Sequence, residues 1–293
     1  MNKRTKRTRW SHRAIWAATC AVVTLTVLVF VVRDAGERTH SAHTTPTEPP
    51  AGTQALIERM FELLEDVRFI SDDPQTARVV ADVAALAESG EYESAETYYA
   101  LGLVRAEAQD FKGAEKAYRK AIAIRPEWNK PYHGLGFLLT RHTVERWDEA
   151  EAMLRKAIEL EPDWSRPHNH LAILLRRQNR FEEAEIHALR AIEANPDIVA
   201  THNNYGNLLL KIRRLNEAEK QYRRAIDLDP AHPKPYYNLG CLYSVRGKPR
   251  QAVEYLAEAI ERDPVFREEA KNDPDFDPIR NTTAFRKLIY DKD

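Results

Sequence analysis

The chain has 293 residues, of which 43% are hydrophobic and 30% are charged. Its only cysteines, Cys20 and Cys241, exclude a disulfide framework and a Cys-x-x-Cys metal or redox pair. The net charge of −1 hides a basic tip over residues 1–13, which has six Lys or Arg and no acidic residue. The mildly acidic remainder argues against a nucleic acid as partner, because binding to phosphates needs a basic face on the folded part.

The first predicted element is a hydrophobic helix over residues 14–32, a stretch without any charge. Such a helix would be about 28 Å long, close to the roughly 30 Å of a bilayer's hydrocarbon core. We therefore expect a single transmembrane signal anchor, with residues 1–13 in the cytoplasm and the C-terminal domain outside it, in the periplasm if the source is a Gram-negative bacterium. A cleavable signal peptide is the alternative, but the hydrophobic run is long and no Ala-x-Ala site follows it.

Two further segments precede the main part of the chain. Residues 33–53 are rich in Thr, Pro, Ala and Gly, and we expect a disordered linker. Residues 54–94 are expected to form N-terminal capping helices, the second of them over about 75–88. Apolar residues between 54 and 70 follow a 4,3,4,3 spacing that is also compatible with a coiled-coil dimer seam (Leu56, Met60, Leu63, Val67 and Ile70). The seam has fewer than the roughly three heptads that such a prediction requires, which favours a cap.

A repeated pattern organises the rest of the chain. Five similar segments, AIAIRP, AIELEP, AIEANP, AIDLDP and AIERDP, end in prolines that are 36, 34, 34 and 34 residues apart. One alanine stands twelve residues before each proline and another stands five before it. Small residues let two helices approach closely, and proline ends a helix. Because no repeat can bury its apolar face alone, the pattern predicts a stack of helical hairpins.

This pattern resembles the tetratricopeptide repeat (TPR) family, whose signature is Trp-x₂-Leu-Gly-x₂-Tyr, Ala-x₃-Phe and Pro over 34 residues. The resemblance implies an all-α fold, a right-handed α-solenoid of helix hairpins. It places five repeats within 95–266, at 95–128, 129–164, 165–198, 199–232 and 233–266, and a C-terminal capping segment at 267–293. The second repeat has two extra residues before Trp147. The aromatic after the first alanine is identified as Tyr118, Tyr222 and Tyr255, with Leu154 and Ala188 in its place in the second and third repeats.

The sequence contains no recognisable catalytic constellation. Nucleotide-binding, hydrolase and zinc-protease motifs are absent, so we expect neither an enzyme nor a cofactor or metal. Asp273, Asp275 and Asp277 resemble the start of a calcium-binding loop, but Pro278 stands where that loop needs glycine. His168 and His202 occupy the tryptophan position of their repeats and are expected to pack.

The family resemblance implies that the first helices line a concave groove for a protein or an extended peptide. The positions that match its groove-facing places provide the candidate binding residues: Lys130, His133, Arg166, Asn169, His170, Asn203, Asn204, Asn207, Lys211, Lys234, Tyr237 and Asn238. Asn204 and Asn238 resemble an asparagine ladder that holds a peptide backbone, since an amide both donates and accepts hydrogen bonds. Alternatively, the asparagines are tolerated on a polar surface. Their replacement by alanine is expected to leave stability almost unchanged. Some members of the family bind a C-terminal carboxylate with a lysine at the fifth place of a repeat, and this lysine is missing here.

These observations predict a membrane-tethered binding scaffold or assembly factor that uses the groove outside the cytoplasm. Two alternatives stay open. One is a non-catalytic accessory subunit of an envelope enzyme complex, of the glycosyltransferase or cytochrome c maturation type. The other is a structural protein that self-assembles through the 54–70 helix. The sequence leaves the oligomeric state open.

Overall fold

The computed structural model describes residues 49–66 and 73–290, so the predicted tip, anchor and most of the linker lie outside the described residues. No strand occurs in these two ranges, which confirms the all-helical prediction. Within these ranges, no helix combines the length and the hydrophobicity that a membrane span requires. The helices are α2 (Thr53–Asp66), α3 (Pro74–Ser89), α4 (Ala95–Glu107), α5 (Phe111–Ile124), α6 (Asn129–His142), η2 (Val144–Arg146), α7 (Trp147–Leu160), α8 (Ser165–Arg177), α9 (Phe181–Ala194), α10 (Val199–Lys211), α11 (Leu215–Leu228), α12 (Pro233–Val245), α13 (Pro249–Arg262), α14 (Val265–Asn272), η3 (Pro274–Phe276) and α15 (Thr283–Tyr290).

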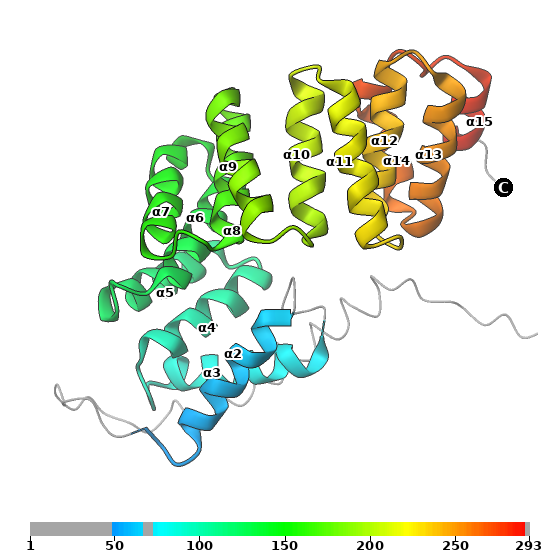
Figure 1. Ribbon diagram of the computed structural model, residues 1–293. Coiled ribbons are helices and arrows are strands. Elements are labelled where there is room, and N and C mark those ends of the chain that lie inside the picture. Colours follow the sequence, from blue (N-terminus) through cyan, green and yellow to red (C-terminus); the bar gives the residue numbers. More distant parts are fainter. Residues whose placement is uncertain (1–48, 67–72, 291–293) are drawn as a thin grey trace, which may run out of the picture.

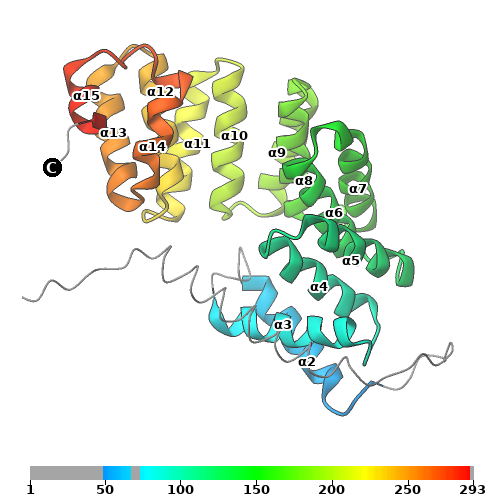
Figure 2. The same cartoon turned by 180° about the vertical axis from the view of Figure 1, so that it is seen from behind.

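The helices form a curved stack of hairpins. The pairs α4–α5, α6–α7, α8–α9, α10–α11 and α12–α13 follow one another along an arc, with α2 and α3 at one end and α14 and α15 at the other (Figure 1). The opposite view shows the same order (Figure 2). Each pair lies within one of the five repeat segments, and each hairpin buries its apolar face against the next, giving a solenoid-like fold.

The turn inside each hairpin reflects the local sequence. In four repeats it contains a residue with positive φ: 62° at Gln109, 62° at Asn179, 64° at Arg213 and 68° at Gly247. Only the last of these is the glycine that this conformation favours. In the second repeat, which has two extra residues, the turn contains the three-residue helix η2 instead, and α7 then begins at Trp147.

The glycine of each Leu-Gly pair allows the two helices of a hairpin to pack closely. A Cβ atom added to Gly102 would come within 2.4 Å of the Tyr118 ring, so no larger residue fits there without a shift. The third repeat packs differently. Ala172 stands at the glycine position and the small Ala188 at the aromatic position, and both are buried.

The fifth repeat corrects one residue assignment made from the sequence. Leu256, not Tyr255, fills the aromatic position, since it is fully buried and lies beside Gly240. Leu256 stands four residues after Ala252, as Tyr222 does after Ala218. Tyr255 precedes Leu256 in the helix and stacks on Tyr243, with 5.3 Å between ring centroids.

Both ends of the stack are covered by helices of the same chain. On α2, Ile57 and Met60 are buried, and Phe61 packs edge-on against Trp128 with ring centroids 5.7 Å apart. Because Met60 belongs to the apolar spacing discussed above, its burial favours a cap over a dimer seam. The helix begins at Thr53, which the sequence placed in the linker.

At the C-terminal end, Phe276 and Phe285 are fully buried, and Leu288 packs against the same core. Phe276 also lies edge-on to Tyr237 of α12, with ring centroids 5.5 Å apart. The Arg280 guanidinium donates to the carbonyl oxygens of Lys271 and Asp273, so it satisfies acceptors that the end of α14 leaves open. The segment after the last repeat therefore closes the stack.

Candidate functional site

The candidate residues of the predicted groove lie on α6, α8, α10 and α12, the first helices of the second to fifth repeats. Each of these helices contacts the next one in the series. We call the surface formed by the candidate residues the inner face. Lys211 and Lys234 are exposed on it, whereas Lys130 lies beside the cap, its ammonium 4.5 Å from the centroid of the Phe61 ring.

Side-chain hydrogen bonds connect neighbouring repeats across the inner face. They join the fifth residue of one repeat to the sixth residue of the next. The pairs are His133 Nε2 with His170 Nδ1 at 2.8 Å, Asn169 Oδ1 with Asn204 Nδ2 at 3.1 Å, and Asn203 Oδ1 with Asn238 Nδ2 at 2.7 Å. Asn169 and Asn203 are buried, and their partners are partly exposed. The asparagines therefore hold the repeats together, a role that sequence reasoning missed.

This ladder changes what the asparagines can offer a ligand. Asn204 and Asn238 each use one N–H in the ladder, and Asn207 Oδ1 accepts a hydrogen bond from Tyr222 Oη at 2.8 Å. In the described ranges, Oδ1 of Asn204 and of Asn238 accepts no hydrogen bond, and Nδ2 of Asn207 donates none. These contacts argue against the expectation that alanine at these positions leaves stability almost unchanged, because the inter-repeat bonds of Asn204 and Asn238 and the bond between Asn207 and Tyr222 would be lost.

An aromatic cluster lies beside the ladder on α6 and α8. The His133 ring is 4.7 Å from that of Trp164, and the Phe137 ring stacks on His170 at 4.3 Å. Burial, together with His170 and Arg166, lowers the pKa of His133 well below its usual range, so this imidazole is neutral at pH 7. The cluster therefore places aromatic rings directly beside the hydrogen-bonding groups of the ladder.

The C-terminal end of the inner face is occupied by the cap. Tyr237 Oη donates to Asp273 Oδ2 at 2.7 Å, so this candidate residue contacts the cap. One ligand atom from each of Cys241, Asp273 and Asp275 lies within 4.8 Å of the other two. Burial, followed by the two carboxylates, raises the pKa of the Cys241 thiol, which keeps the sulfur protonated and a poor metal ligand. Asp277 pairs with Arg280 at 2.7 Å and lies outside this group.

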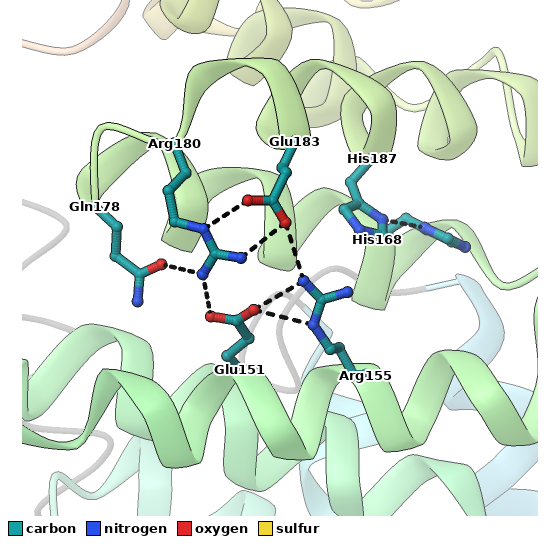
Figure 3. A network of polar contacts seen from close by, with 7 residues as sticks. All are labelled: Glu151, Arg155, His168, Gln178, Arg180, Glu183 and His187. Atoms are coloured by element: carbon teal, nitrogen blue, oxygen red, sulfur yellow. Dashed lines mark hydrogen bonds and ion pairs between the residues drawn. The ribbon is translucent and has the colours of Figure 1, made fainter.

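The opposite, outer face carries a repeated ion-pair network. Figure 3 shows Arg180 between Glu151 of the preceding repeat, at 2.6 Å, and Glu183 of α9, the helix that Arg180 precedes, at 2.7 Å. Equivalent contacts join Arg146 to Glu115 at 2.7 Å and Arg214 to Glu185 at 2.6 Å, and Arg246 pairs with Glu219. Arg146 lowers the pKa of Glu115 to about 2 through its hydrogen bond. The network links successive second helices.

The histidines at the tryptophan position are packing residues. His168 and His202 are both buried, and Nε2 of each donates to the carbonyl oxygen of the proline six residues earlier, at 3.0 and 2.8 Å. Tyr132 and Tyr236 bond the corresponding prolines through their hydroxyls, both at 3.0 Å. The histidines and tyrosines at this position therefore share one property: each donates a hydrogen bond to the carbonyl oxygen of the proline six residues earlier.

Comparison with known proteins agrees with this geometry. Family models described as tetratricopeptide repeat match residues 95–128, 143–197, 170–233 and 221–254. No curated protein matches the chain.

Several solved structures are similar to this chain. One is a Pseudomonas aeruginosa protein from a functional characterisation of pilF. It is 19% identical with a TM-score of 0.56, and the match covers 75% of this chain and 96% of that one. TTC0263, a thermophilic TPR protein of Thermus thermophilus, is 18% identical with a TM-score of 0.54, over 61% of this chain and 97% of that one. YrrB, described as a TPR protein with an unusual peptide-binding site, is 24% identical with a TM-score of 0.46, over 64% and 97%. The family models and the two structures with the higher TM-scores show that the chain contains tetratricopeptide repeats stacked in an all-helical, solenoid-like fold.

Proposed function

We propose that the chain is a non-catalytic binding protein that holds an extended peptide or protein segment on its inner face. The observation that carries this proposal is the set of polar atoms that the ladder leaves available. The free acceptors on Asn204 and Asn238 can receive backbone N–H groups, and the free amide of Asn207 can donate to a backbone carbonyl. These groups bind main chain, so they suit a partner of varied sequence.

We further propose that the repeats act outside the cytoplasm, tethered to a membrane through residues 14–32. The support comes from sequence: an uncharged stretch of membrane-spanning length follows the basic residues 1–13. An accessory subunit of an envelope enzyme complex would use the same surface and differ only in its partner. A reporter fused after Asp293 tests the topology, since a reporter that works only in the cytoplasm should be inactive there.

Site-specific photocrosslinking in native membranes tests the binding surface. A photoreactive residue at Asn204 or Asn238 should capture the same partner, and mass spectrometry should map both crosslinks to one continuous segment of that partner. The matched control is Ala152, an exposed residue of α7 on the second-helix side. Equal capture of that segment from position 152, or none from 204 and 238, would contradict the proposal.

A further inference from the structure

The helices that form the inner face carry charge of one sign. Together α6, α8, α10 and α12 contain seven Lys or Arg residues and no Asp or Glu. Their partners α7, α9, α11 and α13 contain fourteen Asp or Glu and eight Lys or Arg. The whole chain is nearly balanced, with 44 basic and 45 acidic residues, so composition does not explain this segregation.

Favourable interaction with helix dipoles does not explain it either. Basic residues stabilise the last turn of any helix, because the carbonyl end is partly negative. Arg141, Arg177 and Lys211 do lie in the last turns of α6, α8 and α10. However, the last turns of α7, α9 and α11 contain no basic residue, and among these partner helices only α13 has one, Arg262. The basic residues thus follow the surface, which points to something that the surface contacts.

Contacts place these residues along one edge of the inner face. The Arg141 guanidinium is 5.4 Å from the centroid of Phe137, a member of the aromatic cluster. Arg177 reaches from α8 to α6, where its Nη1 donates to the carbonyl oxygen of Thr140 at 2.8 Å. Arg177 and Lys211 are both exposed, and neither is in an ion pair within the described part of the chain. Their charges are therefore available to a ligand.

Arg176 gives the clearest indication that this surface suits an anionic partner. Its side chain is partly buried, yet in residues 49–66 and 73–290 it has no side-chain hydrogen bond and no ion pair. Burial, and then the neighbouring Arg177, lower its pKa. A partly desolvated cation without a counter-charge is unfavourable, and a carboxylate is the group that would compensate it. Tyr222, which lies near this guanidinium, donates its hydroxyl hydrogen to Asn207 of the candidate set.

We infer that the inner face over α6, α8 and α10 takes an acidic extended peptide, with carboxylates contacting Arg176, Arg177 and Lys211. This inference rests on the proposed function and adds the chemical class of the partner. A peptide fits better than a nucleic acid because the C-terminal end of the face carries Asp273 and Asp275. Lys211 lies close enough to Asp275 to influence its ionisation. A continuous polyanion would meet these carboxylates, whereas a peptide can place neutral residues there.

Fluorescence anisotropy with the full-length chain in detergent micelles tests this inference. The probes are three labelled peptides of about ten residues, enough to cross three helices packed roughly 10 Å apart at about 3.3 Å per residue. They alternate alanine with glutamate, glutamine or lysine. We expect the glutamate peptide to bind at least about tenfold more tightly than the glutamine peptide, as for hydrogen bonds to charged groups, and salt to reduce this difference.

Variants then assign the effect to the inner face. Arg176→Gln should weaken binding of the glutamate peptide about tenfold and leave the glutamine peptide unchanged, while Arg176→Lys should retain part of the affinity. Arg190→Gln is the matched control, because it removes the same charge from α9, where Arg190 pairs with Glu193 at 2.8 Å. An equal loss in this control would show that only net charge matters and would overturn the site.

The remaining outcomes separate this inference from the proposed function. Equal affinity for the glutamate and glutamine peptides would refute the acidic preference and leave peptide binding intact. No binding of any of the three peptides would contradict peptide binding as well. Tighter binding of a single-stranded oligonucleotide of the same charge, also lost in Arg176→Gln, would assign the face to nucleic acid.

Discussion

Gly206 lies so close beneath the ring of Tyr222 that a Cβ atom on it would come within 2.5 Å of the ring. The two residues belong to α10 and α11, the paired helices of the fourth repeat. The tyrosine cannot easily move away, because its side chain is fully buried and its hydroxyl hydrogen bonds Asn207 at 2.8 Å. The contact therefore joins core packing in this repeat to a residue of the inner face.

The first prediction concerns this contact. Gly206→Ala should destabilise the stack by about 1–3 kcal/mol, because the added methyl group overpacks the hairpin despite the better helix propensity of alanine. Chemical denaturation followed by helical circular dichroism measures the change. Combining it with Tyr222→Ala imitates the Ala172–Ala188 pair of the third repeat, so the glycine substitution should then be close to neutral or stabilising. The same penalty in both backgrounds would show that the ring is not the cause.

The second prediction concerns the contact between His168 and His187. Nε2 of His168 carries the hydrogen donated to Pro162, so Nδ1 of the neutral ring accepts from Nδ1–H of His187 at 3.0 Å. Burial, followed by His168, lowers the pKa of His187 to about 4, and burial also lowers that of His168. An unfolded chain binds protons near pH 6.5, so the folding stability should fall as the pH decreases from about 6.5 toward 4.

His187→Gln tests this pH dependence, because the fourth repeat already has the substituted arrangement. There the side-chain amide of Gln221 lies 2.8 Å from Nδ1 of the buried His202, and with the amide turned so that Nε2–H faces the ring it donates to Nδ1, because Nε2 of His202 already carries the ring hydrogen. The variant should unfold within about 0.5 kcal/mol of the parent at pH 7 and should lose less stability between pH 7 and pH 5. His43→Gln, in the predicted linker, is the control that removes one histidine from the sequence. An unchanged slope in His187→Gln would place the acid sensitivity elsewhere.

The third prediction concerns the turn between α4 and α5. Gln109 has a φ of 62°, a conformation that disfavours side chains with a Cβ atom, and the equivalent turn of the fifth repeat has Gly247 at 68°. Gln109→Gly should relieve this strain and raise the unfolding free energy by up to about 1 kcal/mol, after the greater flexibility of glycine in the unfolded chain is taken into account. The reciprocal change, Gly247→Ala, should lower it. The thermal unfolding midpoint should therefore rise in Gln109→Gly and fall in Gly247→Ala. Shifts of the same sign in both variants would count against backbone strain.

Much of this fold could be predicted from the sequence because its information is local. The spacing of prolines and alanines reports on helix ends and close helix contacts within one repeat, and these recur in register. The assignment of Tyr255 was wrong because an aromatic residue drew attention one position away from the buried Leu256, although counting from Ala252 gives the right residue.

The candidate site was harder to predict because its contacts join different repeats. Asn169 and Asn204 are 35 residues apart, and their hydrogen bond depends on how two hairpins stack. The repeat register therefore predicts their position on the first helices but not their partners. The basic character of α6, α8 and α10 was present in the sequence, yet it becomes visible only when charges are counted separately for first and second helices.

The last prediction measures the ladder directly. Asn238→Ala removes the hydrogen bond that its Nδ2 donates to the buried Asn203, and this loss should cost about 0.5–1.5 kcal/mol, with more if Asn203 Oδ1 finds no water. A double-mutant cycle with Asn203→Ala should show a coupling energy of at least about 0.5 kcal/mol, because the two side chains share one bond. Asn207→Ala, combined with Asn238→Ala, provides the control, since Asn207 bonds Tyr222 and these two changes should be additive. Additivity of the Asn203 and Asn238 substitutions would mean that each asparagine acts independently, and the amide of Asn238 would then be free for a bound peptide.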